Sequence, residues 1–346
     1  MSRLALARAL LVVCPLMGEH DQLFKRAFRV PEHAMGELGA VLPKAVLDAI
    51  DPDSLELVQG DLTGALLDER FIDALFRAHF RGVPGYIHFL IEHKSEPEEF
   101  TVLQVLEYLA RFWLELLRRE PARKKLPPVV CVVVHHGERG WNAPTSLHDL
   151  VEHLDELPEL KGLVPDFQIL VDDLVEQSDE ALKGRPLGVF PKVVLWVLRD
   201  TRTLERFYEH LVAWADELSR LSSEAKEDAA TVMRYILTVA GTDSFETLRK
   251  RILEVVPAAE EPMATAAEQL IQRGRIQGEA KGKAEGKAEG KAEGKAEDVL
   301  AIFETRGLAV GAERRAQILQ CKDVATLDRW LRQAVTAGSA DELFGQ

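Results

Sequence analysis

Apolar and polar positions divide the chain into a first half that mixes strand and helix patterns and a second half patterned as helix. Two short runs rich in aromatic and aliphatic residues, 71–80 and 86–91, flank the turn-forming segment Gly-Val-Pro-Gly at 82–85 and predict a β-hairpin. Residues 129–134, VVCVVV, are typical of a strand buried on both faces. Further strands are predicted over 54–58 and 166–171.

Helical spacing of apolar residues predicts two short N-terminal helices, 20–29 and 31–41, and a long helix over 99–120. The apolar face predicted for the long helix contains Leu103, Leu106, Ala110, Trp113, Leu114 and Leu117. Later helices are predicted to open at 189–191 and to cover 204–221, 224–240 and 244–255. These elements together indicate an α/β fold with a helical C-terminal extension.

A repeat changes the pattern near the C-terminus. Residues 282–297 are four copies of Gly-Lys-Ala-Glu. A four-residue period drifts by about 40° per repeat around a helix, so it presents no fixed apolar face. Like charges four residues apart and regular glycines also weaken an isolated helix. We therefore predict that 257–297 is a solvated linker, helical only in part, before a small helical region at 298–346.

Charge and cysteine content limit the function classes. The formal net charge of -14 weakens any broad electrostatic attraction to nucleic acid, although it permits a local basic groove. The densest basic run outside the repeat lies at 118–125, and it fits a phosphate contact or a solvated helix end equally well. The three cysteines are far apart and form no CxxC pair, so neither a full disulfide framework nor a four-cysteine zinc site is expected. This cysteine usage fits a reducing, cytoplasmic compartment.

The first residues allow more than one interpretation. Arg3 and Arg8 precede a short apolar run, as in a signal peptide, but no suitable cleavage site follows that run. We favour a start of translation at Met17, which makes the first sixteen residues an upstream extension. No later stretch reaches the ~18 apolar residues of a transmembrane helix, so no membrane association is predicted.

Candidate chemistry gathers around the predicted hairpin. Asp73 lies on the first strand, and the second strand ends in Glu92-His93-Lys94. Side chains alternate along a strand, so Glu92 and Lys94 are expected on one face and His93 on the other. Two acids can hold Mg²⁺ while a lysine offsets phosphate charge or orients water, an arrangement suited to phosphodiester hydrolysis. The alternative is that these residues are ordinary charged side chains at a strand end. It is disfavoured because a charge at the end of an apolar strand costs free energy unless it is paired with an opposite charge or takes part in function.

Other catalytic patterns fit less well. Gln104 and Tyr108 lie four residues apart on one face of the predicted long helix. They fit either an accessory catalytic pair or two ordinary half-buried residues. His135 and His136, with His93 and Cys131, could suggest zinc, but adjacent histidines on a strand point to opposite faces. The chain has no G-x-S-x-G elbow, Walker A loop or Rossmann fingerprint.

An ordered series of motifs resembles the recombination-promoting nuclease (Rpn) family, also known as YhgA-like transposases, within the PD-(D/E)xK nuclease superfamily. The matching segments are 20–25, 41–43, 72–76, 89–95, 126–130, 135–137 and 141–142. The ordered series is specific, whereas each motif alone is not. This chain has Lys94 where the family usually has glutamine, and His135 where it often has tyrosine.

The resemblance implies a restriction-endonuclease-like (PD-(D/E)xK) core and Mg²⁺-dependent DNA cleavage. Asp73, Glu92 and the backbone carbonyl of His93 would hold the ion, and Lys94 would act on water and phosphate charge. Gln104 and Tyr108 would be accessory catalytic residues, and Asp21 or Glu37 would add an outer acid. The transposase label implies mobile-element ancestry.

The predicted organisation has four parts: an extension at 1–17, a nuclease-like domain at 18–256, a charged linker at 257–297 and a helical region at 298–346. We expect DNA as substrate and a homo-oligomer, because a double-strand cut needs two active sites or two visits. One rival hypothesis is a nuclease-like fold that binds nucleic acid or protein without cutting. A second rival makes 258–346 the functional part, as an oligomerisation or partner module.

Overall fold

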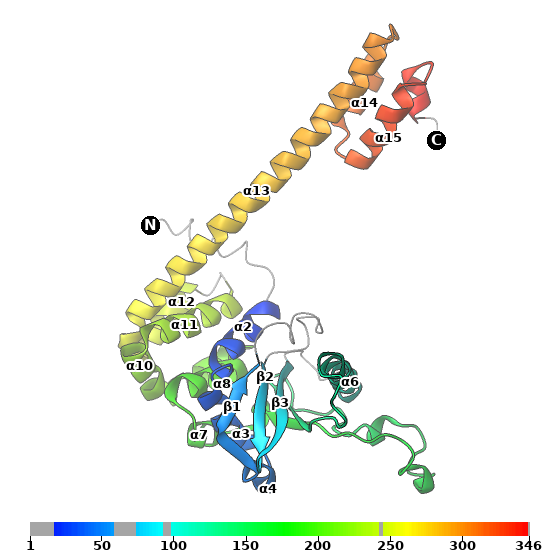
Figure 1. Ribbon diagram of the computed structural model, residues 1–346. Helices are drawn as coiled ribbons and strands as arrows, with labels where there is room; N and C mark the ends of the chain where they lie inside the picture. The colour runs from blue at the N-terminus through cyan, green and yellow to red at the C-terminus, as the bar shows by residue number, and fades with distance from the viewer. Residues whose placement is uncertain (1–16, 59–73, 93–97, 242–244, 345–346) are drawn as a thin grey trace. The chain divides into compact units, whose positions relative to one another are not determined.

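A computed structural model describes residues 17–58, 74–92, 98–241 and 245–344, with the backbone alone for residues 17 and 90–92. The chain divides into two compact units, Met1–Ile271 and Gln272–Gln346. The first unit is a mixed α/β structure built on one sheet, and the second is helical (Figure 1). Among the described residues, no helix is both long enough and apolar enough to cross a membrane.

The sheet of the first unit has five strands in the order β1-β2-β3-β4-β5. Their bounds are β1 Ile50–Leu57, β2 Ala74–Phe80, β3 Val83–Glu92, β4 Val129–His135 and β5 Leu170–Asp173. The first three strands pair antiparallel, and β3, β4 and β5 pair parallel. The predicted hairpin and the buried strand β4, which lies inside the sheet between β3 and β5, are therefore confirmed.

The hairpin turn is tighter than predicted. Phe80 pairs directly with Val83, so the loop consists of two residues, Arg81 and Gly82, both with positive φ (50° and 79°). Two residues with positive φ make a type I′ turn, whose twist matches that of the flanking strands. The predicted turn over 82–85 was wrong, because Gly85 belongs to β3. A Cβ at Gly85 would lie 2.7 Å from the Phe80 ring and 2.9 Å from Pro128, so close packing requires glycine there.

Strands β1 and β5 also differ from prediction. β1 begins at Ile50 and includes the Asp-Pro-Asp segment that was expected to precede it, with a register irregularity between Asp51 and Glu56. Proline is tolerated there because β1 is an edge strand of the sheet. β5 begins later than predicted, at Leu170, and ends two residues later, so that it includes Asp172 and Asp173.

Helices cover both faces of the sheet. The larger core, on one face, combines the sheet with N-terminal helices and with helices that follow β5. These helices are α2 Met17–Phe28, α3 Pro31–Val41, α4 Lys44–Leu47, α7 Asp179–Gly184, α8 Val189–Asp200, α9 Leu204–Leu211, α10 Ala215–Glu224, α11 Lys226–Ala240 and α12 Phe245–Val255. α8 is the centre of this layer, and its Trp196 ring stacks on Trp214 with centroids 5.2 Å apart. The single helix predicted over 204–221 is two helices, α9 and α10.

The other face is covered by α6 (Thr101–Arg119), which packs a smaller core against the sheet. The buried side chains of α6 include Val102, Val105, Tyr108, Leu109, Phe112 and Leu116. The predicted apolar face was wrong, because Leu103 and Leu114 are 48% and 62% exposed. Apolar residues occupy two neighbouring stripes of this helix, and contact with the sheet determines which stripe is buried.

The segment predicted as a partly helical linker is one continuous helix, α13, Glu260–Thr305, so that prediction was wrong. Its first turns belong to the core of the first unit through Met263, Ala266 and Leu270. In the second unit, Ala292 and Ala296 of the repeat are buried with α14 (Ala312–Gln320) and α15 (Val324–Ala334). Packing on these helices gives the last two repeats the apolar face that their period alone does not supply. The three predicted boundaries between the four parts stay predictions.

The other helical segments in the described part of the chain are short 3₁₀ helices. They are η2 His148–Leu150, η3 Pro158–Leu160, η4 Leu174–Glu176, η5 Pro257–Ala259 and η6 Ala340–Phe344.

Candidate functional site

The carboxyl ends of the three parallel strands lie side by side. Glu92, the last residue of β3, pairs with His135, the last residue of β4, and His135 pairs with Asp173, the last residue of β5. Ligands of α/β sheets bind at this edge, where several strands end together. The register therefore places the backbone of Glu92 at the edge where a binding site is expected.

The other residues of the predicted centre lie outside the described part of the chain. These are Asp73, His93 and Lys94; of Glu92, only the backbone is described. The next residue after Asp73 is Ala74, which starts β2 and pairs with Phe89, three residues before Glu92. β2 therefore begins beside the carboxyl-terminal half of β3.

A loop after β4 is anchored to the ends of β4 and β5. The His135 Nε2 atom lies 2.9 Å from the Arg139 carbonyl oxygen, and the His135 ring meets the Trp141 ring edge-on at 5.4 Å. The backbone N–H of Trp141 donates to Asp173 Oδ2 at 2.6 Å. Gly140 lies close to the Glu176 side chain: a Cβ there would be 2.6 Å from a Glu176 carboxylate oxygen, which would have to shift. Asp173 was missed as a candidate, although two acids at the end of an apolar run could have indicated it.

His136 belongs to a buried polar cluster formed by different elements. Its ring lies 4.9 Å from that of His20 in α2, whose Nδ1 is 2.8 Å from the hydroxyl of Tyr235 in α11. Arg202 donates to the His136 carbonyl oxygen at 2.8 Å. Burial raises the pKa of Tyr235, which keeps its hydroxyl protonated. His135 and His136 thus contact separate partners, as expected from strand alternation.

The accessory pair lies on α6. Gln104 is half-buried and donates to the Glu98 carboxylate at 2.6 Å. Tyr108 is buried, and its ring stacks on His88 of β3 at 4.3 Å. Within the described part of the chain, the Tyr108 hydroxyl is buried and has no hydrogen-bond partner. Burial raises the pKa of Tyr108, so this group can donate a proton in a hydrogen bond but cannot act as an anion near neutral pH.

A buried ion cluster ties α3 to β5 beside the strand ends. Arg185 donates to both carboxylate oxygens of Asp172, at 2.7 and 2.8 Å, and to Glu37 at 2.5 Å. Burial, followed by the charge of Asp172, raises the pKa of Glu37 well above its usual value. Glu37 is therefore held in a structural cluster, which disfavours its predicted part as an outer acid of the metal site.

The side chains of Asp179, Asp200 and His210 form a possible metal site, because one ligand atom from each lies within 4.8 Å of the others. A cation already occupies this space. Arg199 Nη2 lies 2.5 Å from Asp179, 2.7 Å from Asp200 and 2.6 Å from His210 Nδ1. Burial alone would raise the pKa of Asp179, but hydrogen bonds from Trp214 and Arg199 lower it. The charges are therefore satisfied without an ion, and we interpret the group as structural.

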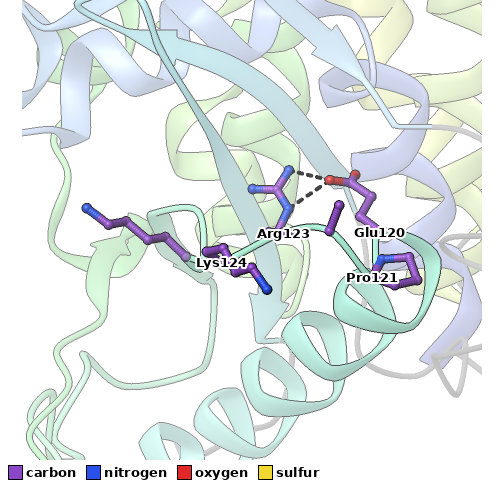
Figure 2. Close-up of a pocket in the computed structure, with 6 residues that line it drawn as sticks. Glu120, Pro121, Arg123 and Lys124 are labelled. Carbon is purple, nitrogen blue, oxygen red and sulfur yellow. Dashed lines mark hydrogen bonds and ion pairs between the residues drawn. The ribbon is translucent and has the colours of Figure 1, made fainter.

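The basic run after α6 lines a surface pocket with Glu120, Pro121 and Ala122. Figure 2 shows Arg123 turned toward Glu120, to which its Nε donates at 2.8 Å, while Lys124 and Lys125 are exposed. This run precedes β4, whose first residue Val129 pairs with Tyr86. Tyr86 is six residues before Glu92, about 20 Å along a strand. The run is thus at the opposite end of the sheet from the candidate site.

Comparison with known proteins identifies relatives of the first unit. The family model described as "Putative transposase, YhgA-like" matches residues 18–228. The chain is 25% identical over 259 residues to the inactive recombination-promoting nuclease-like protein RpnE of Escherichia coli (strain K12), covering 74% of this chain and 82% of that protein.

Two further relatives are named without the word inactive. The chain is 28% identical over 205 residues to the recombination-promoting nuclease RpnC of the same strain, covering 59% of this chain and 66% of that protein. It is 26% identical over 253 residues to RpnD of Escherichia coli O157:H7, covering 72% and 93%. No solved structure matches the chain.

Proposed function

Because the chain belongs to the family described as YhgA-like transposases, we propose that it is a Mg²⁺-dependent DNA endonuclease with a restriction-endonuclease-like core. Relatives at 25–28% identity are named as recombination-promoting nucleases or as inactive members of that group. The reaction is hydrolysis of DNA phosphodiester bonds, and its biological setting is recombination or a mobile element.

The alignment of Glu92, His135 and Asp173 at the strand ends is the observation that carries the proposal. It supports a site at the edge where β2 also begins, and Asp73 immediately precedes β2. Two acids on neighbouring strands can then approach one phosphate group.

The donor set fits Mg²⁺. Asp73, Glu92 and the His93 carbonyl offer oxygen atoms only, which this hard cation prefers, whereas the histidine pair contacts other protein groups. When bound, the ion polarises the phosphoryl oxygen and lowers the pKa of bound water. The Lys94 ammonium would offset charge on the phosphate and orient the attacking water. The Gln104 amide and the protonated Tyr108 hydroxyl would serve as hydrogen-bond donors.

The rival function is a silent nuclease-like fold that binds nucleic acid or a protein. This rival is supported by the relative that is named inactive, because its 25% identity to this chain is close to that of the relatives named as nucleases. The presence of Asp73, Glu92 and Lys94 together favours the enzyme, since a silent fold has no use for all three. Cys131 and Cys321 are free thiols, which supports a reducing, cytoplasmic compartment for either function.

The test is cleavage of supercoiled plasmid by purified variants in Mg²⁺. Asp73→Ala and Glu92→Ala should each lower the cleavage rate at least ~100-fold with an unchanged far-UV spectrum, because each removes a proposed ligand. Asp53→Ala, which removes an exposed carboxylate of β1, is the matched control and should cut normally. Wild-type rates in both ligand variants would overturn the assignment. Binding of DNA by a wild-type chain that never cuts it would support the silent fold.

A further inference from the structure

The chain between β4 and β5 leaves the sheet as an arm, residues 148–164, which Figure 1 shows in green, projecting away from the strands. The two ends of the arm are tied together. Ser146 Oγ donates to Asp166 Oδ1 at 2.9 Å, and Ser146 forms an isolated antiparallel bridge with Gln168. The arm therefore leaves the first unit and returns to it at one point, so its tip is free to meet another surface.

Three leucines, Leu157, Leu160 and Leu163, line up along this arm. The N–H of Leu160 donates to the Leu157 carbonyl oxygen at 2.9 Å, and the N–H of Leu163 donates to the Leu160 carbonyl oxygen at 2.8 Å. Hydrogen bonds between residues three apart bring their side chains onto one side of the turns. Leu163 is 80% exposed, and the other two leucines are exposed as well. The arm therefore displays an apolar ridge that the described residues of its own chain leave uncovered.

The arm also carries negative charge. Residues 148–164 contain five acidic residues and one lysine. Lys161 pairs with Asp155 at 2.9 Å, whereas Glu152 and Glu159 are exposed and form no ion pair with any residue that the structure describes. Acidic side chains around a leucine ridge repel the phosphates of DNA. The arm therefore fits a protein surface that is both apolar and basic.

The last turns of α6 and the run that follows them have these properties. Leu114 and Leu117 are exposed on α6, and Leu126 is exposed directly after the basic run. Between them, residues 118–125 contain five basic residues and one acid, the reverse of the arm. The leucines and the basic run together form a patch at 114–126, which we name the α6 surface.

Two lysines of the α6 surface are available to pair with a partner. Arg118 and Arg119 already pair with Glu115 of the same helix. Lys124 and Lys125 are exposed, and neither is ion-paired within the described part of the chain. The α6 surface therefore offers positive charge beside its leucines, as the arm offers negative charge beside its own.

We propose that two copies of this chain exchange arms, so that each arm packs its leucine ridge and its acids on the α6 surface of the other copy. In a single copy the arm and the α6 surface are both exposed, so neither covers the other. Reciprocal exchange about a twofold axis covers both surfaces on both copies and closes the assembly. A one-way contact would leave one arm and one α6 surface free to add further copies. This inference does not depend on the proposed nuclease activity.

Photo-cross-linking in the full chain tests the contact. Gly162→p-benzoylphenylalanine places a photoreactive side chain beside the ridge, where a Cβ meets nothing within 4 Å. This chain is irradiated with an excess of isotopically heavy wild type. Mass spectrometry should then find the probe peptide attached to heavy peptides from 114–126. The control is Gly184→p-benzoylphenylalanine, at an equally open glycine of α7, which should give no such product.

The heavy label separates contact between copies from contact within one copy. Attachment of the Gly162 probe to light peptides alone would show that the arm contacts its own chain. Attachment to other segments, or no attachment, would show that the arm does not meet the α6 surface. Each of these results would overturn the proposal.

Charge reversal tests whether the acids and the lysines face each other. The yield of the cross-link between copies should fall at least ~10-fold in low salt when both chains carry Glu152→Lys/Glu159→Lys. It should fall equally when both chains carry Lys124→Glu/Lys125→Glu. The yield should return when the probe chain carries the first pair of changes and the heavy chain carries the second. The reversed arm then meets a reversed α6 surface, so opposite charges again face each other.

The control for these variants is Glu209→Lys/Glu254→Lys, which changes the net charge equally at exposed positions of α9 and α12 and should leave the yield unchanged. A yield that neither reversal lowers, or that the mixture of the two variants does not restore, would contradict the exchange of arms.

Discussion

Replacing Arg185 with methionine should destabilise the first unit strongly. Arg185 is 6% exposed and provides three hydrogen bonds to two buried carboxyl groups, those of Glu37 and Asp172. Methionine keeps most of the volume but leaves Asp172, 5% exposed, without this counter-ion. Breaking a buried ion pair by removing one partner costs about 3–5 kcal/mol, because an uncompensated charge stays buried. For a unit of this size the melting temperature should fall by roughly 6–20 °C.

Thermal unfolding at pH 7, followed by circular dichroism, measures this effect. The matched control is Lys44→Met, which removes a lysine from the exposed pair with Asp48 and should change the midpoint little. Asp172→Asn in the Arg185→Met background should recover much of the loss, since it removes the stranded charge. If Arg185→Met and Lys44→Met shift the midpoint equally, the cluster does not hold α3 to β5 as we infer.

Three further results are expected. Burial raises the pKa of Glu37 well above its usual value, so the stability that its proton provides is complete below the unfolded pKa of about 4.3 and is lost as the pH rises through the raised folded pKa. In that window the wild type should lose up to ~1.4 kcal/mol per pH unit relative to Glu37→Gln in urea titrations, and parallel pH profiles would contradict this. Lys94→Ala should lose most DNA cleavage in the plasmid assay but still bind Mg²⁺ in calorimetry, whereas Lys94→Gln should keep part of the activity; full activity of Lys94→Ala would exclude a catalytic lysine. A chain ending at Ile271 should keep the wild-type urea midpoint of the first unit. A chain ending at Val256 should lose at least ~4 kcal/mol of unfolding free energy, because it lacks the buried Met263 and Leu270. Equal midpoints for the two chains would show that α13 does not support that core.

Local patterns were sufficient to predict the elements whose environment is uniform. The run at 129–134 is apolar throughout, and β4 is buried between two parallel neighbours whatever their exact positions. α6 is different, because both Val102 and Leu103 begin plausible apolar stripes. Only the position of the sheet determines that Val102 is buried and Leu103 exposed. The helical state of the last two repeats of α13 depends likewise on packing with α14 and α15, which the repeat itself does not encode.

In the candidate site, too, some features could be predicted from the local sequence and others could not. Glu92 could be placed at a strand end from sequence, because it follows an apolar run and precedes a Ser-Glu-Pro break. Its alignment with His135 and Asp173 depends on parallel pairing between strands that are dozens of residues apart, which no local pattern specifies. The cluster of His20, His136 and Tyr235 is likewise assembled from three distant segments. Such long-range contacts explain why Glu37 was expected near the metal and is instead paired with Arg185.

The central claim is that this chain hydrolyses DNA with a divalent ion held by Asp73 and Glu92. The most direct measurement is the conversion of supercoiled plasmid to nicked and linear forms by the wild type, with Mg²⁺, with EDTA, and with Mg²⁺ restored after EDTA. We expect cleavage in the first and third conditions only, and none by Asp73→Ala in any condition. Cleavage that persists in EDTA, or equal cleavage by wild type and Asp73→Ala, would contradict the account.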